Sequence, residues 1–178
     1  MHPTIFLAAI ALTLGGTPPG HAQDFGFQVS NGLTLEQVSV TQNGTISAPS
    51  SSGGAGSSAV IAQAGNGNSA VSSVSGSQNA GTLVLQQGNA NDAVAVIQNS
   101  PGSVIAQAQL GSSNYSLAAI VGGSANGIAS AQIGNSLSNS VALVDSVGTK
   151  VVYGQAGQSY SGGIVVRNAP PGTVLRLN

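Results

Sequence analysis

Few side chains in this sequence could carry acid–base, nucleophilic or metal chemistry. Of its 178 residues only seven are charged at neutral pH, and both histidines, His2 and His21, lie near the amino terminus. Beyond position 22, apart from three tyrosines, the ionisable residues are Asp24, Glu36, Asp92, Asp145, Lys150, Arg167 and Arg176. Serine is abundant, but a Ser-His-Asp arrangement requires a histidine. That chemistry is therefore excluded beyond position 22.

The remaining charges do not form the other common sites. Zinc ligands are Cys, His or carboxylates, and this chain has no cysteine and only four scattered carboxylates. Glycoside hydrolysis needs two carboxylates on one face, whereas Asp92 and Asp145 are 53 residues apart in sequence. The Gly-rich turns lack the lysine and following helix that phosphate sites use, and three basic residues make no nucleic-acid patch. We expect no enzyme activity, no cofactor, no metal and no nucleic-acid partner.

The amino terminus predicts export. Residues 5–14 form an apolar run that is too short to span a bilayer as a helix, and Gly and Pro follow it. Gly20 and Ala22 suit the small-residue positions before a cleavage site, so we predict a signal peptide over residues 1–22. The alternative is an uncleaved membrane anchor. The mature chain has no predicted stable membrane span, and without cysteine it forms no disulfides.

The overall composition indicates neither an ordinary globular domain nor a disordered chain. Charged residues are 4% of the sequence, against about 25% in globular proteins. Disordered chains combine low hydrophobicity with high net charge, but here the net charge is −1 and the mean hydropathy is +0.25. A nearly uncharged chain rich in amides and small residues is typical of cross-β order.

The sequence repeats every 23 residues. The repeat is marked by the glutamines Gln63, Gln86, Gln109, Gln132 and Gln155, each followed two positions later by Gly65, Gly88, Gly111, Gly134 or Gly157. Five positions after the first three glutamines come Asn68, Asn91 and Asn114, and Leu137 and Tyr160 replace Asn in the last two units. An aliphatic column follows at Val74, Ile97, Ile120, Leu143 and Val166. A fixed period of this length indicates stacked structural repeats.

Each unit reads as strand, turn, strand, turn. In the second unit we predict strands over 82–86 and 92–98, a turn at 88–90 and a closing turn at 99–102. The closing turn falls on residue types that tolerate positive φ, namely Gly76, Asn99, Gly122, Asp145 and Asn168. The expected fold is an all-β, amyloid-like cross-β solenoid of about five stacked strand-turn-strand repeats of 23 residues.

Alternation along each strand predicts which side chains face inward. In the second unit they are Thr82, Val84, Gln86, Asn91, Ala93, Ala95 and Ile97. Stacking places equivalent residues about 4.8 Å apart. The glutamine column can then form an amide ladder, because an amide both donates and accepts. The alternative is that Gln and Gly are surface turn residues of a soluble solenoid.

The repeat resembles that of the curlins, whose unit runs Ser, five residues, Gln, any residue, Gly, two residues, Asn, any residue, Ala, and then a further Gln. Ser57-x5-Gln63-x-Gly65-x2-Asn68-x-Ala70 fits this pattern, and Ser103-x5-Gln109-x-Gly111-x2-Asn114 fits its first part. The aliphatic column replaces the family's second Gln. The resemblance covers residues 57–167. It implies a bacterial structural subunit of an extracellular, cell-surface curli fibre, a functional amyloid that supports biofilm matrix and cell adhesion. Its implied partners are copies of itself, other curlin-like subunits and a secretion and assembly machinery. Both a major and a minor or nucleating subunit are compatible with it.

The two ends depart from the repeat. We expect residues 23–56 to be an irregular segment and 57–178 to be the repeat domain. The irregular segment contains a partial unit over 36–44, offset by 21 from Gln63, and a flexible Ser/Gly-rich insert over 49–58. Residues 24–27 are either a contact for the export apparatus or a disordered tail. Asn178 falls on the next glutamine column, which would turn Arg176 inward and make this end a cap or anchoring face. The alternative is a frayed tail.

Three functions suit these expectations to different degrees. A self-assembling fibre subunit uses the open edges of a short solenoid. A soluble secreted β-solenoid adhesin or surface-binding protein would need an outward row of Thr or aromatic residues, and a β-helix enzyme acting on carbohydrates would need clustered carboxylates. The sequence shows neither feature, so it favours the fibre subunit.

Overall fold

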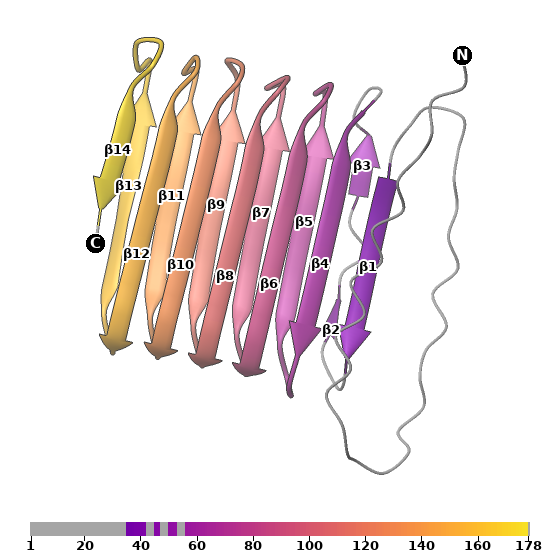
Figure 1. Ribbon diagram of the computed structural model, residues 1–178, viewed down its shortest axis with the longest axis vertical. Helices are drawn as coiled ribbons and strands as arrows, with labels where there is room; N and C mark the ends of the chain where they lie inside the picture. Colours follow the sequence, from indigo (N-terminus) through magenta and orange to yellow (C-terminus); the bar gives the residue numbers. More distant parts are fainter. Residues whose placement is uncertain (1–34, 42–44, 47–49, 53–55, 178) are drawn as a thin grey trace, which may run out of the picture.

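The chain forms a solenoid of parallel β-strands (Figure 1). A computed structural model describes residues 35–41, 45–46, 50–52 and 56–177, with side chains described from residue 56 onward. The predicted signal peptide and residues 24–27 lie outside this part. The described residues form strands and no helix. The prediction of an all-β solenoid of about five turns with 23-residue spacing is thereby confirmed.

Two sheets make up the solenoid. Sheet A consists of β1 (Leu35–Thr41), β4 (Ser58–Ala64), β6 (Gly81–Asn89), β8 (Val104–Ser112), β10 (Gly127–Asn135), β12 (Lys150–Gln158) and β14 (Val174–Leu177). Sheet B consists of β2 (Thr45–Ile46), β3 (Ser50–Ser52), β5 (Ser69–Ser75), β7 (Asp92–Gln98), β9 (Tyr115–Val121), β11 (Ser138–Val144) and β13 (Ser161–Arg167). From β4 to β11, each strand pairs in parallel with the strand 23 residues further on.

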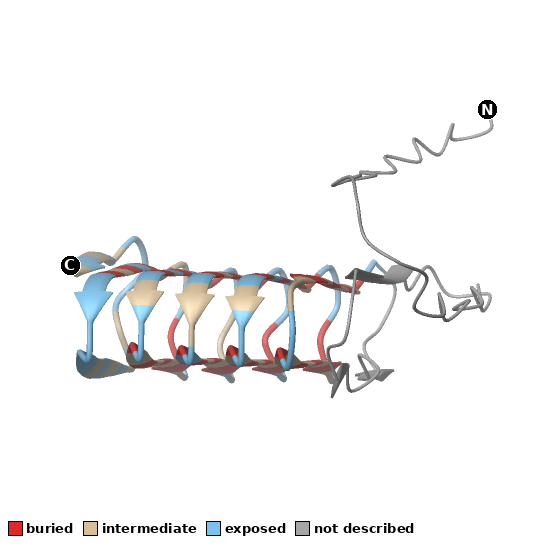
Figure 2. Ribbon diagram, turned by 90° about the horizontal axis from the view of Figure 1, so that it is seen from below, coloured by how far each residue is buried: buried red, intermediate tan, exposed pale blue. Residues whose placement is uncertain are grey.

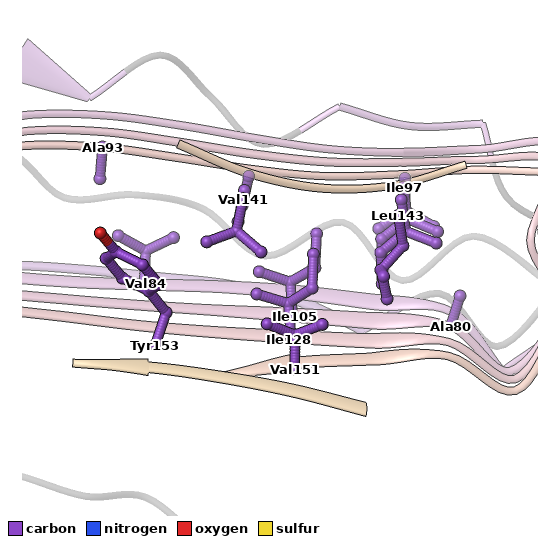
Figure 3. Close-up of a cluster of buried hydrophobic side chains, with 14 of the residues drawn as sticks. Ala80, Val84, Ala93, Ile97, Ile105, Ile128, Val141, Leu143, Val151 and Tyr153 are labelled. Atoms are coloured by element: carbon purple, nitrogen blue, oxygen red, sulfur yellow. The ribbon is translucent and has the colours of Figure 1, made fainter. Parts of the chain in front are cut away.

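The core lies between the two sheets (Figure 2). Along each strand buried and solvent-facing residues alternate. The seven residues expected to face inward in the second unit are all buried. Aliphatic side chains of both sheets point toward one another, with Ile97 and Leu143 on one side and Ile105, Ile128 and Val151 on the other (Figure 3). Burying these columns supplies the hydrophobic part of the stability.

The corners follow from residues that adopt positive φ. All five residues of the predicted closing-turn column have φ between 48° and 72°. The first corner is later than predicted, because β6 continues through Gly88 and Asn89, which pair with Gly111 and Ser112. The left-handed residue there is Ala90, with φ of 54°. The strand predicted over 92–98 has those bounds in the structure.

The amino-terminal expectations need two corrections. β1 pairs with β4 at an offset of 23, which sets Val40 opposite Gln63, so the predicted offset of 21 is wrong. A shift of two residues keeps the same side chains on each face, and the alternating pattern alone therefore could not fix the register. The insert over 49–58 is also not uniformly flexible, since Ser50–Ser52 form β3 and pair with β5.

The carboxy-terminal register differs as well. β14 pairs with β12 at an offset of 24, with Leu175 opposite Val151 and Leu177 opposite Tyr153. Arg176 consequently faces outward and is exposed, and the prediction of an inward arginine is wrong. A shift of one residue exchanges the two faces of a strand. Here it places two leucines on the core and avoids the desolvation of a charged side chain.

We predict that Gly111→Ala destabilises the solenoid, because Gly111 has φ of 121° and an added Cβ would overlap the carbonyl oxygen of Gly134. The expected loss is at least about 2 kcal/mol of unfolding free energy, measured by urea denaturation of dilute protein followed by circular dichroism. The matched control is Gly127→Ala, whose added Cβ would lie 3.7 Å from Lys150 Cγ. It should change stability by less than about 1 kcal/mol. Equal losses in the two variants would contradict the role assigned to the stacked corner.

Candidate functional site: the amide ladders and the solenoid ends

The five glutamines of the repeat form one continuous ladder inside the solenoid. The Nε2 of Gln86 donates to Oε1 of Gln109 at 2.7 Å, and Gln109 donates to Gln132 at 2.8 Å. Gln132 donates to Gln155 at 2.9 Å, and Gln63 donates in the same way to Gln86. All five side chains are buried. Every bond runs in the same direction, from Nε2 of one turn to Oε1 of the next turn toward the carboxy terminus.

In Gln86, Gln109, Gln132 and Gln155 the amide nitrogen also donates across the interior to a backbone carbonyl of the other sheet. Gln109 Nε2 donates to the backbone carbonyl of Asp92 at 3.0 Å, and Gln132 Nε2 donates to that of Tyr115 at 2.9 Å. Asp92 belongs to the turn before Gln109, and Gln132 belongs to the turn after it. One amide therefore joins three successive turns and both sheets. Because a buried amide without partners costs about 1–3 kcal/mol, each turn depends on its neighbours.

The asparagine column forms a second ladder at the first corner. Asn91 Nδ2 donates to the carbonyl oxygen of Gly111 at 2.9 Å, and its Oδ1 accepts from the backbone N–H of Asn114 at 3.2 Å. The same carbonyl of Gly111 is the group that a side chain at Gly88 would displace. The asparagine and glycine columns therefore require each other. The ladder ends where Leu137, which is buried, donates its backbone N–H to Asn114 Oδ1 at 3.0 Å.

A third polar column at the opposite corner was not singled out from the sequence. Asn126 N–H donates to Ser103 Oγ at 3.0 Å, and Thr149 N–H donates to Asn126 Oδ1 at 3.1 Å. In the same corner Ser100 N–H donates to Ser77 Oγ at 2.9 Å. The only sequence signal is that small polar residues recur at 23-residue spacing. That signal is hidden because Ser, Asn and Thr substitute for one another as acceptors.

The glutamine ladder has two different ends. At the amino-terminal end Gln63 Oε1 finds no hydrogen-bond donor within the described part of the chain, and its strand partner is Val40. At the carboxy-terminal end Gln155 Nε2 donates to the carbonyl of Ser138 at 2.9 Å and to the hydroxyl of Tyr153 at 3.3 Å. No ladder glutamine follows Gln155 among the described residues, and the tyrosine hydroxyl is its second acceptor.

The carboxy-terminal face of the solenoid is only half covered. β14 pairs with Lys150–Tyr153 alone. Within residues 56–177 no strand pairs with the outer edge of β13. Although Ile164 and Val166 pack on the core, β13 contains no buried residue. Beside it lies an open pocket of about 460 Å³ whose lining includes Tyr153, Tyr160 and Arg176. This end exposes both unpaired backbone groups and core side chains.

Comparisons with known proteins find no matching family model, no matching curated protein and no matching solved structure. In the part of the chain that the structure describes, no helix is long and apolar enough to cross a membrane. Nor do three or more His, Cys, Asp or Glu side chains gather there in a way that could hold a metal ion. The ladders and the ends are thus the features from which a function can be argued.

We predict that the cost of losing a ladder amide depends on its position. Gln109→Leu removes two ladder bonds and leaves the acceptor of Gln132 unpaired. It should therefore lower the unfolding free energy by about 2–5 kcal/mol. Gln63→Leu removes one ladder bond and should cost less. The measurement is urea denaturation of both variants under one set of conditions.

The matched control is Gln87→Leu, the same substitution at an exposed position on β6 next to the ladder. Its stability should stay within about 0.5 kcal/mol of that of the unchanged protein. If Gln109→Leu were as mild as this control, the ladder would not be a source of stability.

Proposed function

We propose that this chain is an exported structural subunit of an extracellular, curli-like amyloid fibre, which assembles by stacking solenoid ends and supports biofilm matrix and surface adhesion. The single observation that carries the proposal is the half-covered carboxy-terminal end. There β13 presents an open strand edge, and Ile164 and Val166 remain partly exposed.

The ladders supply the physical reason for end-to-end growth. Every turn offers the next turn the same backbone and amide groups in the same register. The two ends of the glutamine ladder are of opposite polarity, and Gln63 Oε1 at the amino-terminal end has no donor among the described residues. A contact between unlike ends does not close on itself, so it propagates into a filament. Open strand edges are the common template for such pairing.

The proposed compartment and partners follow from the sequence. A cleaved signal peptide over residues 1–22 would export the chain, and a secretion and assembly machinery would deliver it to the bacterial surface. The partners in the fibre would be further copies and other curlin-like subunits. We propose no catalytic activity, cofactor or nucleic-acid partner.

A soluble secreted β-solenoid adhesin is the second candidate, and one observation favours it. β14 covers part of the carboxy-terminal edge, and Tyr153 already accepts the free hydrogen of Gln155. These contacts are what a terminating cap would provide. In that case the solenoid would act as a monomer.

X-ray fibre diffraction on the purified exported protein at neutral pH separates the two candidates. A fibre subunit should form unbranched fibres without denaturant, with reflections near 4.8 Å and 10 Å. A stable monomer rich in β-structure that gives no fibres over weeks would overturn the fibre proposal and support the soluble adhesin.

We predict that truncation after Arg167 accelerates assembly, since it removes β14 and leaves the whole edge of β12 open. Thioflavin fluorescence of seeded reactions would measure the elongation rate, which should rise several-fold. The matched control is the full-length Arg176→Ala variant, which keeps β14 and removes only its charge. An unchanged rate after truncation would show that β14 is not a partial cap.

A further inference from the structure

The outer face of sheet A is apolar, and nothing in residues 56–177 covers it. On β4, β6, β8, β10 and β12 three columns of side chains point away from the core. They consist of Val60, Ala62, Ala64, Leu83, Leu85, Gln87, Ala106, Ala108, Leu110, Ala129, Ala131, Ile133, Val152, Gly154 and Ala156. Gln87 is the one polar side chain among these fifteen positions, and none of the fifteen is buried. Leu85 is 43% exposed and Ile133 is 58% exposed.

The outer face of sheet B differs in character. Its outward positions include Asp92 on β7 and Arg167 on β13. Serines occupy six further outward positions, at Ser69, Ser73, Ser75, Ser138, Ser140 and Ser161. Both faces belong to the same solenoid and experience the same packing constraints from the core. The apolar character of sheet A is therefore a property of that face and not of the fold.

The size of the face indicates what can cover it. Five strands at about 4.8 Å spacing and five residues at about 3.3 Å rise give roughly 400 Å² per chain. Contiguous apolar patches of several hundred Å² mark interaction sites. A stable pair of isolated proteins buries about 800 Å² on each partner, so this face is too small to hold two single subunits together. In a filament each added subunit extends the face, and the contact becomes cooperative.

The chemistry of the face favours a second copy over a lipid surface. Interfacial membrane binding relies on basic residues beside large apolar groups. The basic residues on sheet A in the described part of the chain, Lys150 and Arg176, both lie at its carboxy-terminal end. The centre combines small residues, such as Ala108 and Ala131, with larger ones, such as Leu85 and Ile133. Dry sheet-on-sheet packing at about 10 Å uses such interdigitating side chains.

We propose that two filaments of this protein pair face to face through the outer faces of sheet A, leaving both sheet B faces in solvent. This inference rests on the proposed fibre function. It adds to that function a lateral interface, a defined partner and a fixed number of filaments. Pairing stops at two because the sheet B face carries charges and hydroxyls that resist burial.

Mass per unit length of fibres formed by the exported protein, measured by dark-field electron microscopy, tests the proposal. The unchanged protein should give twice the mass per length of a single stack. Ala108→Lys places a charge at the centre of the sheet A face and should halve this value. Ala119→Lys is the matched control, since Ala119 lies outward on sheet B in the same turn and is exposed to a similar degree. It should leave the value unchanged.

A crosslinking experiment makes the test independent of whether the lysine variants assemble. The chain has no cysteine, so Ala108→Cys introduces a single thiol at the centre of the face. A short bismaleimide should link facing copies into dimers, because equivalent residues of successive subunits in one stack are about 24 Å or more apart. Ala119→Cys should give no dimers.

The outcomes separate this inference from the function on which it rests. Fibres of single-stack mass from the unchanged protein, or equal crosslinking at both positions, would overturn lateral pairing and leave the fibre proposal standing. A protein that forms no fibres at all would overturn both, because the face is too small to pair isolated subunits.

Discussion

The buried ladder glutamines of this protein bond to copies of themselves one turn away. Gln109 donates to Gln132, and Gln132 in turn donates to Gln155. This pairing favours the observed stacking register, because a shift by two residues would set Gln109 against Ser130 or Gly134 and break its ladder bond. The asparagine ladder favours the same register at the first corner, because it also bonds successive turns. It also explains the glycine column, since Asn91 reaches the carbonyl of Gly111 only where the backbones approach closely.

The same requirement explains which parts of the fold were predictable from the sequence. Residues that bond to their own copies must recur at a fixed spacing, so the 23-residue period, the inward glutamines and the positive-φ column were all visible. The register prediction was wrong at the two ends. Val40 stands opposite Gln63 in β1, and Leu177 stands opposite Tyr153 in β14. In β14 a shift of one residue breaks no amide ladder, and it places Leu175 and Leu177 on the core.

Other inward columns vary in residue type, because close packing constrains only the combined volume of the side chains that face each other from the two sheets. Gln107 bonds Ser116 across the interior at 2.9 Å, and the next turn carries Ser130 bonded to Asn139 at 2.7 Å. In the last turn Tyr153 fills the space above Gly162, where an added Cβ would overlap the tyrosine hydroxyl. A large residue on one sheet thus accompanies a small one on the other, as close packing of a thin interior demands. No single column reveals this compensation, which is why sequence periodicity missed it.

A ladder of identical side chains can continue from turn to turn without limit. Other residues must therefore occupy the positions at its two ends. In this chain the terminating groups are a valine opposite Gln63 and a tyrosine hydroxyl beside Gln155. Within the described residues both are incomplete, because Gln63 Oε1 has no donor there and no described strand pairs with the outer edge of β13. The four residues of β14 cover less than half of the nine-residue β12. A complete cap would need a second strand over β13, and within residues 56–177 the chain supplies none. Under the proposed fibre function, a further copy would supply the strand contacts that are missing at the carboxy-terminal end.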